Sequence, residues 1–242
     1  MSEARKIKEE GNMVKMLASL ASREFSDTLD FVWKSPRFLR DERGREMRKA
    51  IKYFPGDIRM SLLRWRHHKH RLNNVFPYLV ATGNLFCVMS LFEVYMLRLA
   101  RTLEEIVGKE LKEASGQGVQ RVLNFLRDCG IRTNEISLWP QIDAALKIRN
   151  CLAHAAGLLQ WSRDEQEIRR IARSGTFLKY QERAKKRTPQ GEFYDVMIVS
   201  SDVGDRITIS PLYAWLVTYY CRDYFIELCS MADNIENAAS EK

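Results

Sequence analysis

The chain has 242 residues and a mass of 28.3 kDa, which suits one large domain or one domain with an extension. Apolar residues make up 45% of it and charged residues 29%, which excludes a disordered chain and allows a full hydrophobic core. With only 12 glycines and 6 prolines, collagen-like and low-complexity classes are excluded and the composition favours helix.

The formal net charge of +8 lies entirely in the first third of the chain. Residues 1–75 hold 18 Lys and Arg against 10 Asp and Glu, a difference of +8, whereas residues 76–242 hold 21 of each. Concentrated positive charge favours a polyanionic partner, because each neutralised phosphate releases counterions. The nucleic-acid contacts expected from the basic clusters are Arg64, Arg66, Lys69, Arg71, Lys185 and Lys186. A solvated helix face and an acidic protein partner are the alternatives.

Cysteine usage and the N-terminus both predict a cytoplasmic protein. The five cysteines include no CxxC pair, which indicates reduced thiols, and no apolar signal segment opens the chain. Residues 72–92 carry no charge, about the length of a membrane span. Asn73, Pro77 and Gly83 interrupt the run and Glu93 follows it, so we expect a buried core helix and no membrane partner.

Three helices are predicted in the first third. Apolar residues at helical spacing predict a helix over 12–33, which Pro36 should end. A basic helix over 41–53 follows, and then a basic segment over 57–73. The apolar side of this third segment is predicted to be Ile58, Leu62, Leu63 and Trp65.

The rest of the chain is predicted to be a helical bundle with a β-hairpin over about 193–209. A helix over 77–107 is apolar nearly all round, which indicates a central place in the bundle. Further helices are expected over 119–128, 138–156, 163–173 and from Ser210-Pro211 to about 235. The predicted organisation is therefore all-α: a basic helical extension, 1–75, followed by a bundle domain, 76–242.

Most common catalytic motifs are absent from the sequence. It contains no P-loop, no dinucleotide-binding loop, no GxSxG and no HExxH. His67, His68 and His70 lie among arginines that would repel a cation, so we expect neither a metal site nor a cofactor.

One segment stands out, Ile148-Arg-Asn-Cys-Leu-Ala-His-Ala-Ala-Gly157. With 25 Arg and 4 His in the chain, roughly 0.4 Arg–His pairs at this spacing arise by chance, and requiring Asn after the Arg lowers that to about 0.015. The segment also closes an apolar helix that stops at a glycine. The competing pair, Arg64 and His70, has Trp65 after the Arg and no apolar helix around it.

At this segment the sequence resembles the HEPN superfamily, whose ribonuclease members carry Arg, a polar residue and then His on a long helix of a bundle. The resemblance covers about 76–237 and implies a helical bundle, a homodimer and metal-independent cleavage of RNA. It also implies a toxin–antitoxin or antiphage role, with an antitoxin or nucleotidyltransferase-type partner. The site residues it implies are Arg149, Asn150 and His154, with Glu93 as a weaker member.

These residue types suit RNA cleavage through the 2′-hydroxyl. Histidine can take or give a proton near neutral pH, and arginine binds phosphate oxygens in a bidentate manner. Asn150 and His154 share a helix face, whereas Arg149 is turned about 100° away. One helix therefore should not direct all three at one point, which is a reason for a dimer. A carboxylate such as Glu93 on a nearly all-apolar helix should have a partner, for which Arg149 is the candidate; the alternative is that Glu93 simply faces the surface.

Two functions of other classes remain open. The chain could be a non-catalytic helical module that binds RNA or DNA through its basic N-terminal region. Alternatively, it could be a helical adaptor whose basic face meets an acidic protein.

Overall fold

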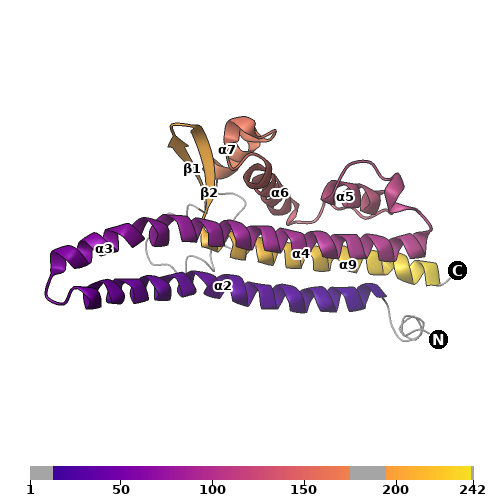
Figure 1. Cartoon of the computed structure of the whole chain (residues 1–242). Helices are drawn as coiled ribbons and strands as arrows, with labels where there is room; N and C mark the ends of the chain where they lie inside the picture. Colours follow the sequence, from indigo (N-terminus) through magenta and orange to yellow (C-terminus); the bar gives the residue numbers. More distant parts are fainter. Residues whose placement is uncertain (1–12, 175–194, 241–242) are drawn as a thin grey trace. The chain divides into compact units, whose positions relative to one another are not determined.

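The computed structural model describes residues 13–174 and 195–240, and the fold is all-α with one inserted β-hairpin, as predicted (Figure 1). The α-helices are α2 (Met13–Tyr53), α3 (Ile58–His70), α4 (Phe76–Val107), α5 (Val119–Asp128), α6 (Trp139–His154), α7 (Glu165–Ser174) and α9 (Pro211–Ser240). The short turns are the π-helix η1 (Arg71–Val75) and the 3-10 helices η2 (Leu111–Glu113) and η3 (Leu159–Trp161). Strands β1 (Val196–Ser201) and β2 (Gly204–Ile209) pair antiparallel.

The described residues form two compact units, and α2, α4, α6 and α9 each contribute to both. The first unit contains the described residues up to Thr28, Cys87–Leu146 and those from Val217 onward. The second contains Leu29–Phe86 and the described part of Lys147–Leu216. The segment that stands out in the sequence, Arg149 to His154, belongs wholly to the second unit.

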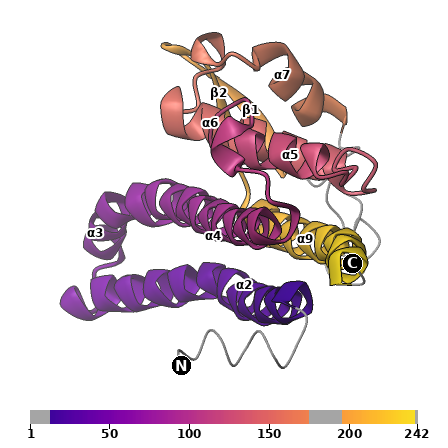
Figure 2. The same cartoon turned by 90° about the vertical axis from the view of Figure 1, so that its right-hand side faces the viewer.

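Aromatic side chains join the three long helices of the first unit. The start of α2 runs antiparallel to α4 and α9 (Figures 1 and 2). The buried ring of Tyr95 on α4 lies 5.8 Å from that of Phe25 on α2 and 5.4 Å from that of Phe225 on α9. Each such ring stabilises the fold by about 1.5–3 kcal/mol through the apolar surface it buries.

Pro36 does not end the first helix, and this prediction was wrong. α2 continues through it to Tyr53. Proline cannot donate to the carbonyl four residues earlier, which is that of Val32. The Ser35 hydroxyl donates to this carbonyl at 3.0 Å and in turn accepts a hydrogen bond from Asn84 Nδ2 on α4 at 2.8 Å. The neighbouring side chain thus satisfies the carbonyl that proline leaves unpaired.

The helix over 57–73 is confirmed, but neither Asn73 nor Pro77 interrupts the run of helix. α3 passes through η1 directly into α4, which has Pro77 as its second residue. The wider π-helical turn lies just before the proline, where a regular hydrogen-bonding pattern would fail.

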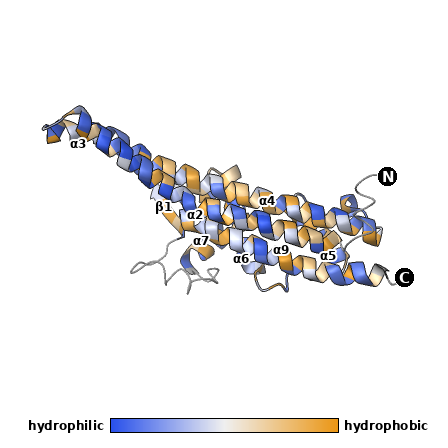
Figure 3. Ribbon diagram, turned by 90° about the horizontal axis from the view of Figure 1, so that it is seen from below, coloured by the Kyte–Doolittle hydropathy of each residue, from blue (hydrophilic) through white to orange (hydrophobic). Residues whose placement is uncertain are grey.

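Apart from Trp65, the predicted apolar side of α3 does not face inward. Ser61 is its buried residue, and Arg64, Trp65 and His68 are half-buried beside it. Ile58, Leu62 and Leu63 are exposed, and Figure 3 shows hydrophobic and hydrophilic residues intermingled around this helix. The periodicity of α3 therefore does not mark its packed face.

The long helix over 77–107 is confirmed as α4, but it is not buried all round. Leu79, Val94 and Leu97 are exposed. The continuous helical stretch Ile58–Val107 is long and apolar enough to cross a membrane by length and composition alone, a test that the core helix of a soluble protein also passes.

The hairpin and the last helix are confirmed, although residues 193 and 194 of the predicted hairpin lie outside the described residues and α9 continues beyond the predicted end to Ser240. In the hairpin Ser201 pairs with Gly204, so Asp202 and Val203 form the turn. The hydroxyl of Ser210 accepts a hydrogen bond from the Tyr213 N–H at 3.2 Å, which caps the start of α9.

Candidate active site

The end of α6 has an unusual backbone. The helix stops at His154, and the N–H groups of Ala155 and Gly157 both donate to the Cys151 carbonyl at 3.0 Å. Ala156 has φ +50° and Gly157 has φ +80°, both in the left-handed region. Two successive residues of this kind turn the chain sharply away from the helix axis and leave the last turn of α6 at the surface.

Gly157 fixes this helix end to the hairpin. Its carbonyl accepts a hydrogen bond from the Ile207 N–H of β2 at 2.8 Å, and Leu158 pairs with Arg206 in a single β-bridge. A Cβ at position 157 would lie 3.1 Å from the Ile207 carbonyl oxygen and 3.3 Å from Arg206 Cγ. Both the conformation and the close approach therefore require glycine.

The polar residues of the segment lie on the outer side of α6. Arg149 is half-buried, whereas Asn150 and His154 are exposed. Arg149 Nη1 donates to Asn150 Oδ1 at 3.0 Å. The long arginine side chain thus bridges the angle that separates the two positions on the helix, and the structure brings their polar groups together. Across residues 13–174 and 195–240, the His154 ring makes no hydrogen bond.

Apolar residues of the same segment anchor it from the other side. Cys151 and Leu152 are buried, and Cys151 Sγ lies 4.0 Å from the Leu158 carbonyl oxygen. Burial raises the pKa of the Cys151 thiol, although a hydrogen bond with Ser162 opposes the shift. A thiol with a raised pKa is a poor nucleophile at neutral pH, so Cys151 serves packing.

Sequence reasoning missed Arg206 of β2, which supports the helix end. Its guanidinium carbon lies 4.8 Å from the ring centre of Tyr78 on α4, and Arg206 Nη2 donates to the Tyr78 hydroxyl at 2.8 Å. The Nε of the same guanidinium is buried without a partner among the described residues. The two residues are 128 positions apart, so no local signal could reveal their contact.

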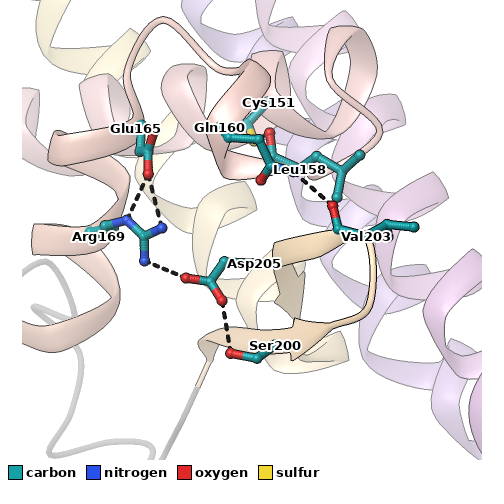
Figure 4. A network of polar contacts seen from close by, with 8 residues as sticks. All are labelled: Cys151, Leu158, Gln160, Glu165, Arg169, Ser200, Val203 and Asp205. Atoms are coloured by element: carbon teal, nitrogen blue, oxygen red, sulfur yellow. Dashed lines mark hydrogen bonds and ion pairs between the residues drawn. The ribbon is translucent and has the colours of Figure 1, made fainter.

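A second polar network fixes the hairpin to η3 and α7 (Figure 4). Gln160 Nε2 donates to the Val203 carbonyl at 2.8 Å, while Arg169 pairs with Glu165 at 2.9 Å and with Asp205 at 2.8 Å. The Ser200 hydroxyl and then the Arg169 guanidinium lower the pKa of Asp205. The hairpin is therefore held at its turn and along β2, and it gives α6 a defined support.

Glu93 is half-buried on α4 in the first unit, whereas Arg149 belongs to the second. Their expected pairing stays a prediction.

Among the predicted nucleic-acid contacts, some are held by neighbouring aromatic rings and others extend freely into solvent. Arg64 stacks on Tyr53 at 4.1 Å, and Arg71 lies 5.4 Å from the Phe76 ring centre while donating to His68 Nδ1 at 3.0 Å. Arg66 and Lys69 are exposed. The remaining two, Lys185 and Lys186, lie outside the described residues.

A further basic surface lies along α7. Gln166, Arg169, Arg170 and Arg173 line a shallow hollow of about 410 Å³. Arg170 pairs with Glu167 at 2.8 Å, so part of this charge is neutralised.

Among the described residues, no group of three or more His, Cys, Asp or Glu side chains could hold a metal ion.

Comparison with family models, with curated proteins and with solved structures gives no match for this chain.

Proposed function

We propose that the chain is a metal-independent endoribonuclease of HEPN type whose reaction centre is the exposed end of α6. The observation that carries the proposal is the arrangement of three polar side chains there. The guanidinium of Arg149 is linked to Asn150, and His154 presents an exposed ring with no hydrogen bond to the rest of the described chain. All three are held on a helix whose end is fixed to β2.

In the proposed reaction the 2′-hydroxyl oxygen of RNA attacks the adjacent phosphorus, and the bond to the 5′-oxygen of the next nucleotide breaks. The products are a 2′,3′-cyclic phosphate and a free 5′-hydroxyl. His154 transfers a proton at the attacking or the leaving oxygen. Arg149 binds the phosphate oxygens, where negative charge grows in the transition state, and Asn150 orients the guanidinium.

We also propose that two copies of the chain act together, because a single histidine serves only one of the two proton transfers. A toxin–antitoxin or antiphage role in the cytoplasm, with an antitoxin or nucleotidyltransferase-type partner, fits such an enzyme.

The decisive experiment uses a labelled RNA and the same oligonucleotide with one 2′-deoxy nucleotide at the cleaved position, both in EDTA. Cleavage of the RNA to a cyclic phosphate, with an intact deoxy substrate, supports the proposal. Cleavage of the deoxy substrate, or activity that needs added Mg²⁺, contradicts it.

A second candidate function is a non-catalytic RNA- or DNA-binding module. It is favoured by the net charge of residues 1–75 and by the exposed Arg66 and Lys69. Salt-dependent binding of RNA without any cleavage in the same assay would select it.

A further inference from the structure

The turn between α2 and α3 carries an exposed surface that is both basic and apolar. We call residues 45–66 the α2–α3 tip. It holds seven Lys and Arg against two Asp and Glu, a difference of +5. Seven large apolar side chains in the same stretch are between 38% and 79% exposed: Met47, Ile51, Tyr53, Ile58, Met60, Leu62 and Leu63. Water-exposed aliphatic groups at this density indicate a contact surface.

Local contacts hold the two helices of the tip together. The guanidinium of Arg64 on α3 stacks on Tyr53 at the end of α2. Arg43 lies 6.0 Å from the ring centre of Trp65. The Asp57 carboxylate accepts a hydrogen bond from the Met60 N–H at 3.0 Å and starts α3. The aliphatic side chains take no part in these contacts and stay available to a partner.

The arrangement of the aliphatic residues argues against a single helix as the partner. Successive residues of a helix are turned by about 100°, so Ile58, Leu62, Leu63 and Met60 extend over about 200° around α3. A docked helix covers one stripe of its neighbour. An aliphatic set that covers more than half of the circumference of the first turns of α3, next to a chain reversal, suits a medium that can close around it.

Charge argues against a second copy of the tip as the partner, and chemistry argues against nucleic acid. Two copies of a tip with a charge of +5 repel each other when they meet face to face. Nucleic acid can contact the basic residues of the tip, Arg66 among them, but it leaves the aliphatic ones exposed, because bases stack on aromatic rings and guanidinium groups rather than on Leu or Ile.

We propose that the α2–α3 tip binds the surface of a membrane that contains anionic lipids. Basic side chains meet the headgroups, and Ile58, Leu62 and Leu63 enter the boundary between headgroups and acyl chains. This is surface attachment, in which no helix spans the bilayer. It departs from the expectation of no membrane partner, which rests only on the argument against a membrane-spanning helix. The attachment is independent of the proposed ribonuclease activity.

The test is sedimentation of the full chain with phosphatidylcholine vesicles, with and without phosphatidylglycerol. We expect binding to the anionic vesicles that weakens as salt is raised. The double substitution Leu62→Ser and Leu63→Ser should lower the partition constant at least about tenfold, and Arg59→Gln about fivefold. Val203→Ser, which changes an equally exposed apolar residue on the hairpin turn, should have no effect.

Circular dichroism of each variant shows whether it is folded, and Ile58→Asp gives a second, independent disruption of the apolar set. Failure of the wild-type chain to bind anionic vesicles would overturn the proposal. So would equal binding by the Leu62/Leu63 variant. If total RNA displaces vesicles while the leucine variant still binds them normally, the tip is a polyanion surface. If neither protein binds vesicles, and the wild-type chain self-associates whereas the Leu62/Leu63 variant does not, the partner is a second copy of the chain.

Discussion

Arg206 and Tyr78 lie 128 positions apart and are joined twice, by a hydrogen bond of 2.8 Å and by stacking of the guanidinium on the ring. The contact fixes β2 to the start of α4. Because Ile207, the next residue, holds the end of α6 through Gly157, the pair also supports the helix end that carries His154.

Replacing Tyr78 by Phe tests this contact. The ring and its stacking are kept, but Arg206 loses a hydrogen-bond acceptor while its Nε is already unpaired. We expect a loss of about 1–2 kcal/mol in the free energy of unfolding, measured by urea denaturation. Tyr53→Phe is the matched control, because Tyr53 is exposed and stacks on Arg64 in the same manner. Equal effects of the two substitutions would show that the Tyr78 hydroxyl does not matter.

Replacing Gly157 by Ala should destabilise the fold. The new Cβ would force a residue with φ +80° into an unfavourable region and approach the Ile207 carbonyl oxygen to 3.1 Å. We expect a cost of about 1–3 kcal/mol. Gly83→Ala in α4 is the opposite case, since nothing lies within 4 Å of its Cβ and the helix favours alanine by about 0.5–1 kcal/mol. Thermal unfolding of both variants should shift in opposite directions.

The elements that the sequence predicted well are those with local signals. The helix over 119–128 has the predicted bounds, and Ser210-Pro211 starts the last helix through a cap that lies within four residues. Gly157 marks the end of α6 for the same reason, since its conformation depends on its own backbone.

The errors arise where contacts with residues far away in the sequence decide how a segment folds or packs. Pro36 is a helix breaker in isolation, but the Ser35 hydroxyl donates to the Val32 carbonyl, and Asn84, 49 positions from Ser35, donates a hydrogen bond to that hydroxyl. The leucines of α3 resemble a core face, yet the helix packs through Ser61 and Trp65. In the candidate site the guanidinium of Arg149 reaches Asn150 although the two positions are turned about 100° apart on the helix, because the arginine side chain is long and flexible. The expectation that one helix does not direct all three side chains, His154 included, at one point stays a prediction.

Asp195 should give the protein a distinctive pH dependence. Its side chain is buried and burial raises its pKa, although a hydrogen bond from the Ser210 hydroxyl at 2.8 Å opposes this. A raised carboxyl pKa means that stability is full below the ordinary value of 3.8 and is lost as the pH rises through the folded value. Asp195→Asn keeps an acceptor for Ser210 and never ionises. Its stability relative to wild type should therefore increase from pH 3 to pH 7, and a constant difference would contradict this.

Arg66 and Lys69 should set RNA affinity rather than cleavage rate. Both are exposed and can meet phosphates, whereas Arg64 is engaged by Tyr53. Replacing both by Ala removes two contacts, so the slope of log binding constant against log salt for single-stranded RNA should fall by about 1.4. The maximal cleavage rate at saturating RNA should not change. An unaltered slope would show that RNA binds elsewhere on the chain.

His154→Ala should abolish cleavage without unfolding the protein. The ring is exposed and makes no hydrogen bond to the described residues, so its removal should leave the thermal midpoint and RNA binding nearly unchanged. Loss of one proton-transfer group lowers a rate by about 10²–10⁴-fold. Arg149→Ala should lose turnover as well, but with weaker binding, because its charge also meets the phosphate of the bound substrate. His70→Ala, another exposed histidine, is the control and should keep full activity. If it loses as much activity as His154→Ala, the reaction centre is not the end of α6.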